Sequence, residues 1–380
     1  MYKTFQYRLY PTKSQLRKLE ETLESCRWVY NETLALRKNN WEEDGEETSL
    51  YDTSYHLTSW KEHNEFLYNV YANVLQNVQQ RVDLAFKAFF RRVKSGEEPG
   101  YPRFKNKNRY DSFTFPKNVG FKIKSTICFS KKSGLKRVLS VSKIGDLKIK
   151  LHRRLEGQIK TLTIRKTSTG KWFASFSCEL DSPLVVRPIN NSIGIDLGLT
   201  TFATFSDGSS IPRQRFFKTY EKRLANASRK REALPKGSKR RNKARLVESK
   251  IHEKTANIRR NFVCKEALLL VQQYDLICFE DLNLTQMQDT NKKAIKKGIA
   301  DVAWNQFIRF TQYKAENAGK RVVLVDPKNT TRECSRCGLI VPKELSERTH
   351  SCSCGLILDR DHNAAINILR RGLASFDRKV

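Results

Sequence analysis

Three acidic residues in separate parts of the chain have the chemistry and the surroundings of metal ligands. Asp196 follows the apolar run 193–195, and Glu280 follows the similar run 276–279. Both runs are typical of buried strands, which would place each carboxylate at a strand end. Asp361 begins a segment whose apolar residues follow helical spacing. Brought together, three such carboxylates can hold two Mg²⁺ ions beside a phosphodiester and support metal-dependent hydrolysis.

Each acid taken alone has a simpler explanation. An aspartate at a strand end beside glycines can cap a turn, and His362, next to Asp361, can face solvent. Because a buried carboxylate is costly unless it is paired, hydrogen-bonded or bound to metal, the set of three argues for catalysis more strongly than any member. The neighbouring acids Asp281 and Asp359 are expected to face solvent or to cap.

Four of the nine cysteines form two closely spaced pairs. They are Cys334 and Cys337, followed after residues 338–351 by Cys352 and Cys354. Such pairs are typical of a tetrahedral Zn²⁺ site of the zinc-ribbon kind, which is structural because no coordination position stays open. The second pair has one intervening residue where two are usual, and His350 is close enough to replace Cys352; four cysteines are the preferred set. The other cysteines are predicted to be core residues: Cys26, Cys128, Cys178, Cys264 and Cys278.

The charge of the chain indicates a polyanionic partner. Its 380 residues include 72 Lys or Arg and 40 Asp or Glu, a formal net charge of +32, and the pI is near 9.9. A membrane surface also attracts cations, but no stretch approaches the roughly 20 apolar residues of a span. Since no secretion signal is expected, the cysteines are predicted to be reduced thiols. Together with the charge, this predicts a cytoplasmic nucleic-acid-binding protein. The sequence has no ATP-type phosphate loop.

Hydrophobic periodicity predicts the elements of the first half. Residues 2–9 alternate as one strand, and residues 13–38 and 70–91 have helical spacing. The acidic segment 42–47 is expected to be a solvated loop. From 113 to 180 the period is two, which predicts a β-barrel or sandwich of about six strands.

The second half begins with two predicted strands, 192–199 and 200–206. A very basic stretch follows, and its later part is predicted to be a helix whose core-facing edge consists of Val247, Ile251, Ile258 and Phe262. The strand ending at Glu280 precedes a Lys-rich segment, 285–298, which we expect to act as a lid.

One face of the predicted helix 70–91 consists of carboxamides. These are Asn73, Gln76, Asn77 and Gln80. Asn and Gln can pair with adenine through two hydrogen bonds in a major groove, so this face is a candidate DNA-reading surface. The alternative is an ordinary polar helix face.

Several of these motifs recur together in one known family. They include Tyr-Arg-Leu-Tyr-Pro-Thr at 7–12, Pro-Gly-Tyr-Pro-Arg-Phe-Lys at 99–105, Gly-Ile-Asp-Leu-Gly-Leu at 194–199, Asn-Ile-Arg-Arg at 257–260, Glu-Asp-Leu-Asn at 280–283, and the two cysteine pairs followed by Asp-Arg-Asp-His-Asn-Ala-Ala at 359–365. With them the chain resembles the TnpB family, transposon-encoded relatives of type V CRISPR effector nucleases, over nearly its whole length.

The resemblance implies a multidomain α+β fold. It implies a β-barrel wedge domain formed by 1–12 and 111–189, with a helical recognition domain, 13–110, inserted in it. An RNase H-like (RuvC) α/β nuclease domain would follow at 190–330 and 358–380, with a zinc ribbon inserted at 331–357.

The resemblance also implies an activity. It makes Asp196, Glu280 and Asp361 the catalytic acids and ligands of two Mg²⁺ ions. A guide RNA from the transposon end would direct cutting of double-stranded DNA beside a short motif, with one protein per RNA. The alternatives are a transposase that performs strand transfer and an RNA-dependent DNA-binding regulator.

Overall fold

The computed structural model describes residues 2–128, 134–180, 188–282, 303–344 and 347–377. The chain forms two compact units, Met1–Ser182 and Pro183–Val380. The predicted lid, 285–298, lies outside the described residues. None of the described helices has the length and apolar character needed to cross a membrane.

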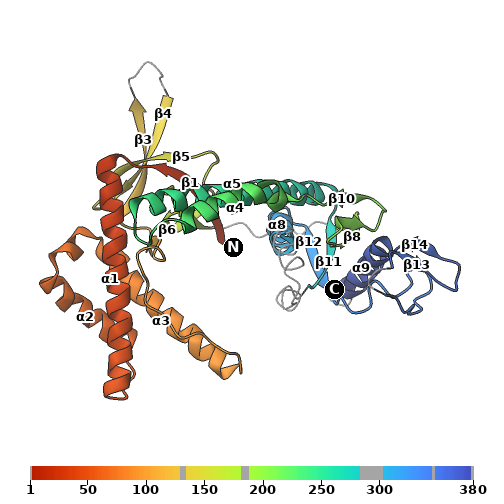
Figure 1. The fold of residues 1–380 in the computed structure, drawn as a ribbon, viewed down its shortest axis with the longest axis horizontal. Coiled ribbons are helices and arrows are strands. Elements are labelled where there is room, and N and C mark those ends of the chain that lie inside the picture. The colour runs from red at the N-terminus through yellow and green to blue at the C-terminus, as the bar shows by residue number, and fades with distance from the viewer. Residues whose placement is uncertain (1, 129–133, 181–187, 283–302, 345–346, 378–380) are drawn as a thin grey trace. The chain divides into compact units, whose positions relative to one another are not determined.

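The first unit contains a seven-stranded antiparallel sheet with the order β2-β6-β7-β1-β5-β4-β3. The strands are β1 Tyr2–Tyr10, β2 Ser112–Phe115, β3 Phe121–Cys128, β4 Gly134–Val141, β5 Gly145–Lys150, β6 Gln158–Lys166 and β7 Trp172–Glu179. Alternate residues of β7 are buried, as the predicted period of two requires. β1 pairs with both β5 and β7, so the helices that follow it in sequence are inserted between the first strand and the rest of the sheet (Figure 1).

The sheet is curled. Its edge strands are β2 and β3, yet the rings of Phe115 on β2 and Phe121 on β3 lie 5.8 Å apart. The Phe121 ring is also 6.2 Å from Phe176 on the inner strand β7. In the described part of the chain, aromatic packing rather than a hydrogen-bonded ladder thus joins the two edges.

The insertion holds α1 Lys13–Glu43, α2 Leu50–His63, the short 3₁₀ helix η1 Glu65–Asn69 and α3 Ala72–Lys94. The predicted helices α1 and α3 are confirmed. Arg37 on α1 forms a buried ion pair of 3.2 Å with Asp83 on α3. Burial alone would raise the pKa of Asp83, but Lys87 and Arg37 outweigh it and leave the pKa lowered. This pair fixes α1 against α3.

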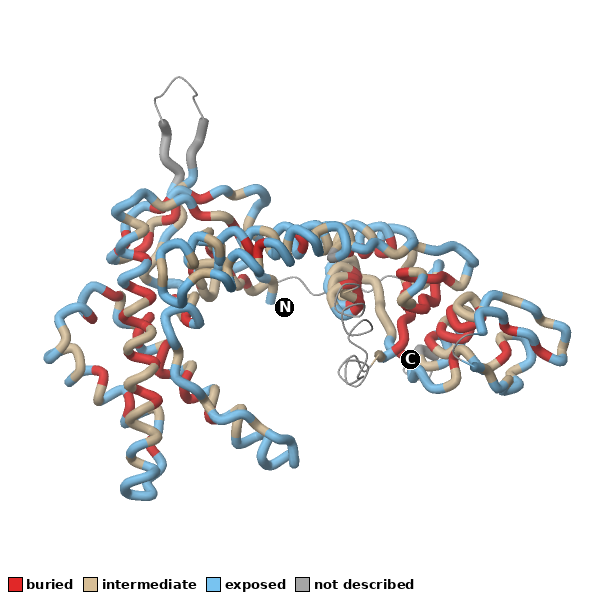
Figure 2. Tube along the Cα trace, viewed as in Figure 1, coloured by how far each residue is buried: buried red, intermediate tan, exposed pale blue. Residues whose placement is uncertain are grey.

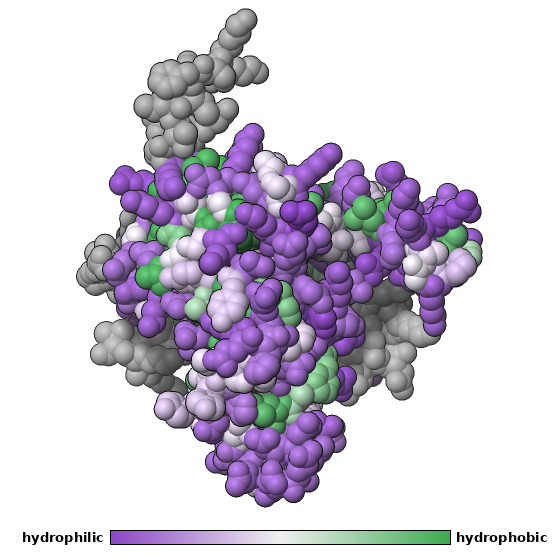
Figure 3. Space-filling view, turned by 90° about the vertical axis from the view of Figure 1, so that its left-hand side faces the viewer, coloured by the Kyte–Doolittle hydropathy of each residue, from purple (hydrophilic) through white to green (hydrophobic). Residues whose placement is uncertain are grey.

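The surface of the chain reflects its many charged residues. The face shown in Figure 3 is mainly hydrophilic, and its apolar residues form small separate patches rather than one broad area. Such scattered apolar exposure is ordinary for a protein surface.

The second unit contains a mixed five-stranded sheet with the order β10-β9-β8-β11-β12. The strands are β8 Ser192–Asp196, β9 Thr201–Phe205, β10 Ser210–Pro212, β11 Leu276–Glu280 and β12 Arg321–Val325. β8, β11 and β12 run parallel, whereas β9 and β10 continue as antiparallel neighbours of β8. The remaining elements are α4 Phe216–Glu232, α5 Lys239–Gln273, α8 Trp304–Asn317, the strands β13 Thr349–Ser351 and β14 Ile357–Asp359, and α9 Arg360–Asp377.

Helices cover both faces of this sheet (Figure 2). α5 and α8 pack on the face that carries Ile277 and Phe279. α9 packs on the opposite face, which carries Leu276 and Cys278. The core-facing edge predicted for α5 was wrong at Val247 and Ile258, which are exposed, whereas Ile251 and Phe262 are half-buried. The buried apolar residues of this helix begin at Val263.

Two glycines let α9 lie unusually close to the sheet. A Cβ at Gly194 on β8 would lie 2.6 Å from the Leu369 amide nitrogen and would overlap the Ala365 carbonyl oxygen of α9. On the helix side, a Cβ at Gly372 would overlap the Cys278 sulfur on β11. The sheet and the helix each provide one position without a side chain, so neither can take even a methyl group there.

Replacing Gly194 by alanine should therefore destabilise the second unit by about 1–3 kcal/mol, the usual cost of overpacking. Urea unfolding measures this, with Gly100→Ala as the matched control, since Gly100 has open space around it. Equal stability of the two variants would contradict the close approach of α9.

Candidate functional site

Two of the three predicted acids lie side by side at the ends of neighbouring strands. In the parallel register of β8 and β11, Ile195 is opposite Phe279, and the next residues are Asp196 and Glu280. Because alternate side chains share a face, Asp196 lies on the face of Gly194, and Glu280 on the face of Cys278. That is the face covered by α9. Sequence reasoning placed both acids at strand ends, and the structure brings them together.

This strand edge is also where the connections diverge. From β8 the chain turns to β9 on one side, and the chain after β11 returns as β12 on the other side. In open α/β sheets, ligands bind outside the carboxyl ends of the strands at such a switch point. The position of Asp196 and Glu280 is therefore a candidate binding site on topology alone.

The third acid, Asp361, reaches the same edge from the first turn of α9. Asp359 caps this helix by accepting from the backbone N–H of Asp361 at 2.9 Å and of His362 at 3.1 Å. A Cβ at Gly198 would lie 3.9 Å from Asp361 Oδ2, so the turn after β8 lies near this carboxylate. The capping predicted for Asp359 is confirmed, and Asp281 is exposed as expected.

The acids create an unfavourable concentration of negative charge. Burial, reinforced by the charges of Glu280 and Asp361, raises the pKa of Asp196 well above its usual value. Burial also raises the pKa of Glu280, although Thr330 donates a hydrogen bond to its Oε1. A cation bound between these oxygens would relieve the repulsion. Hard carboxylate donors at a strand edge match the ligand preference of Mg²⁺.

Arginine side chains neutralise part of this charge. Asp361 is 3.5 Å from Arg348 and 3.2 Å from Arg360. Among the described residues, the three carboxylates do not form a group whose ligand atoms all lie within 4.8 Å of one another. The acids thus face one site without the close spacing of a metal-bound set.

The four predicted cysteines do form such a group. Their sulfur atoms all lie within 4.8 Å of one another, with 3.7 Å between Cys334 and Cys354 and 3.6 Å between Cys337 and Cys352. This cluster is compatible with a zinc ribbon.

The two cysteine pairs lie on turns of different length. Gly338 donates to the Cys334 carbonyl, four residues back, whereas Gly355 donates to the Cys352 carbonyl, three residues back. Both glycines have positive φ, 79° and 84°, which suits a tight turn without a side chain. The shorter second pair is therefore accommodated by a turn that is one residue tighter.

His350, the alternative ligand considered from the sequence, lies beside the cluster and is fully buried. Its Nδ1 contacts the Lys343 amine, and the ring is not part of the four-sulfur group. This geometry favours the four cysteines.

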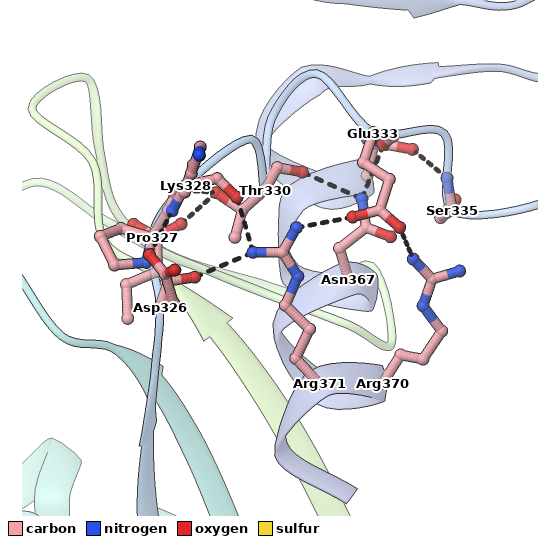
Figure 4. Close-up of polar contacts among 11 residues, drawn as sticks. Asp326, Pro327, Lys328, Thr330, Glu333, Ser335, Asn367, Arg370 and Arg371 are labelled. Atoms are coloured by element: carbon pink, nitrogen blue, oxygen red, sulfur yellow. Dashed lines mark hydrogen bonds and ion pairs between the residues drawn. The ribbon is translucent and has the colours of Figure 1, made fainter. Parts of the chain in front are cut away.

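A polar network joins the cysteine ribbon to α9 (Figure 4). Asn367, fully buried on α9, donates to the carbonyls of Thr330 at 2.9 Å and of Glu333 at 2.7 Å. Asn363 donates to the Glu333 carbonyl and accepts from the Ser335 N–H, next to Cys334. Because Thr330 also holds Glu280, the network connects an acid to the first cysteine pair.

Two arginines of α9 complete this network. Arg370 and Arg371 both pair with Glu333, and Arg371 also donates to the carbonyls of Asp326 and Lys328 (Figure 4). Sequence reasoning missed these residues. The signal that could have indicated them is the spacing of Asn363 and Asn367, two polar residues four apart among the buried alanines and Ile368 of α9.

The carboxamide residues lie on α3 as expected. Gln76 and Gln80 are exposed, whereas Asn73 and Asn77 are half-buried. Asn77 Nδ2 lies 3.4 Å from Gln80 Oε1. Gln76 and Gln80 are thus the two carboxamides of this face that are exposed to solvent.

The remaining cysteines behave largely as core residues. Cys26, Cys178 and Cys278 are buried and Cys264 is half-buried, while the side chain of Cys128 lies outside the described set. His362 is half-buried, and its Nε2 is 3.3 Å from the Ser206 carbonyl, so it packs on the neighbouring turn.

Three family models match the chain. A helix-turn-helix domain model matches residues 1–46, a model described as a probable transposase matches 175–291, and a Cas12f1-like TNB domain model matches 304–368. The last range includes the cysteine cluster and Asp361. In the structure, residues 2–43 form a strand and one long helix rather than a helix-turn-helix.

Proteins similar in sequence include a putative RNA-guided DNA endonuclease of Streptomyces pristinaespiralis. It is 31% identical over 381 residues, which cover 98% of this chain and 90% of the relative. The putative RNA-guided DNA endonuclease InsQ of Escherichia coli K12 is 26% identical, over 97% of this chain and 92% of its own length.

Solved structures support the same fold. A Cas12f1 complex with guide RNA and target DNA is similar over 93% of this chain and 82% of that chain, with a TM-score of 0.59 and 15% identity. The RNA-guided endonuclease Cas-phi3 is similar over 98% of this chain and 92% of that chain, with a TM-score of 0.57 and 9% identity. The 31% identity to the Streptomyces protein over nearly the full length, together with the match to the probable-transposase model, shows that the chain belongs to the TnpB (IS605 OrfB) family.

Proposed function

We propose that this chain is an RNA-guided endonuclease that cuts double-stranded DNA beside a short motif. The observation that carries the proposal is the meeting of Asp196, Glu280 and Asp361 at one sheet edge in a chain with a net charge of +32. The relatives named as RNA-guided DNA endonucleases match it almost end to end.

Asp196, Glu280 and Asp361 would hold two Mg²⁺ ions, which supply an activated water and stabilise the leaving oxygen when bound. The protein contributes the approach of the two strand ends and the placement of the third acid by α9. Arg348 and Arg360, which pair with Asp361, would place positive charge beside the phosphates of a bound nucleic acid.

The domain layout follows from the same proposal. The mixed sheet of the second unit would be the RNase H-like (RuvC) nuclease domain, interrupted by the zinc ribbon at 331–357. The curled sheet of the first unit would be the β-barrel wedge domain, with the helices of 13–110 as recognition domain. The chain would act in the cytoplasm as one protein per guide RNA, contacting the RNA through its backbone and shape.

Asp196→Asn should abolish DNA cutting while leaving RNA and DNA binding intact, because it removes one metal-binding carboxylate. Cutting is measured on a target plasmid with protein–RNA complex purified from cells that carry the native locus. Asp281→Asn is the matched control, since Asp281 is adjacent in sequence but exposed. Undiminished cutting by Asp196→Asn would remove the active-site assignment, and joined rather than broken DNA ends would favour a transposase.

The cysteine cluster should hold one Zn²⁺ per chain. Elemental analysis of the purified protein should find this ion, and Cys352→Ser should lose most of it because four thiolates complete the tetrahedron. Cys264→Ser and His350→Gln should keep it. Retention by Cys352→Ser together with loss by His350→Gln would instead make the histidine the fourth ligand.

The exposed carboxamides of α3 should contribute to recognition of the flanking motif. Gln76→Ala with Gln80→Ala should weaken binding of motif-containing duplex DNA about tenfold or more, since a bidentate base contact is worth about 1–3 kcal/mol. RNA affinity should change little. The double variant Gln272→Ala, Gln273→Ala, on an exposed helix end, is the control. Equal weakening of RNA and DNA binding would argue against base reading.

A further inference from the structure

A pocket on the second unit lies away from the three acids. It has a volume of about 680 Å³ and lies between Arg260 of α5 and the outer side of α8. Phe307, on the inner side of α8, packs against Phe279 of the sheet at 5.7 Å. Since α9 and the acids occupy the opposite face of that sheet, the pocket is separate from the proposed catalytic site.

Aromatic rings form part of the pocket wall. Phe310 and Tyr313 stand at 81° to each other with centroids 5.7 Å apart. Tyr313 is 42% exposed, so part of its ring is open to a ligand. An exposed ring in a concave site offers a stacking surface for a planar ligand.

The pocket also carries positive charge. The Arg260 guanidinium lies 6.0 Å from the Phe310 ring, and Arg309 is exposed on α8. Glu316 is the acidic residue of the wall, and Gln312 supplies a donor and an acceptor. Arg260 ends the basic part of α5, so the pocket continues a cationic surface.

We propose that this pocket binds one unpaired nucleotide of the guide RNA. The base would stack on Tyr313, with Gln312 and Glu316 at its polar edge, and the phosphate would lie on Arg260 and Arg309. Aromatic stacking with arginine at the phosphate is the usual way in which proteins hold unpaired nucleotides. The inference rests on the proposed function, because it assumes that a guide RNA is present.

The test measures affinity for the RNA recovered with the wild-type chain from cells carrying its native locus, in filter binding over a range of salt. Tyr313→Ala should weaken binding roughly tenfold, since stacking of one base is worth about 1–3 kcal/mol. Tyr313→Phe should stay near wild type because it keeps the ring. Tyr51→Ala is the control, since Tyr51 is 84% exposed on α2 outside the pocket.

Charge and stacking can be separated in the same assay. Arg309→Gln should reduce the slope of log affinity against log salt by about 0.7, the value for one phosphate of a single strand. Tyr313→Ala should leave that slope unchanged. Ultraviolet crosslinking of the complex should join RNA to the peptide containing Tyr313.

The possible outcomes distinguish a failure of the pocket proposal from a failure of the proposed function. RNA affinity of Tyr313→Ala equal to wild type, in a protein that binds RNA and cuts DNA, would overturn the pocket alone. The same result with weakened DNA binding would assign the pocket to a DNA strand and also overturn the inference. A wild-type chain that retains no defined RNA would overturn both.

Discussion

The close packing of α9 on the sheet is the constraint on which the candidate active site depends. Asp196 and Glu280 are neighbours because their strands are paired, but Asp361 is distant in sequence and reaches them only through its helix. Gly194 and Gly372 allow that helix to contact the backbone of one strand and the Cys278 side chain of the next. A helix held this tightly has little freedom to tilt, so its first turn has a defined position relative to the strand ends.

The repulsion among the three acids opposes this arrangement, and the packing of α9 on the sheet maintains it. Burial, reinforced by the charges of Glu280 and Asp361, raises the pKa of Asp196, and the stability lost there must be supplied by the core around the acids. The hydrogen bonds of Asn363 and Asn367 and the ion pairs of Glu333 tie α9 to the loop before the cysteine cluster. The cluster and the acids are therefore parts of one structural unit.

Sequence predicted the local elements well where one physical signal dominated. Short apolar runs predicted the strands that carry Asp196 and Glu280, and cysteine spacing predicted the four-sulfur cluster. Helix α2 was missed, although Ser49 and Asp52 form a capping box at its start. The prediction that Val247 and Ile258 face the core was wrong because apolar residues also occur on exposed helix faces.

The tertiary relationships could not be read from periodicity. The hydrogen bond from Thr330 to Glu280, the bonds of Asn367 to two carbonyls and the packing of Phe121 on Phe176 each depend on residues brought together by the completed fold. Hydrophobic pattern specifies which side of an element is buried, but not its partner. For the same reason the α5–α8 pocket had no signature in sequence.

The place of β1 within its sheet has a consequence for biogenesis. β1 lies between β5 and β7, and Phe5 pairs with Phe176. This inner strand therefore cannot complete its pairing until nearly the whole first unit has been made. At 5–20 residues per second the ribosome needs roughly 10–30 s for that interval. Helices α1 to α3 emerge within it and rely on contacts closer in sequence, which form faster. The order of synthesis therefore allows α1 to α3 to form before β1 has either of its partner strands.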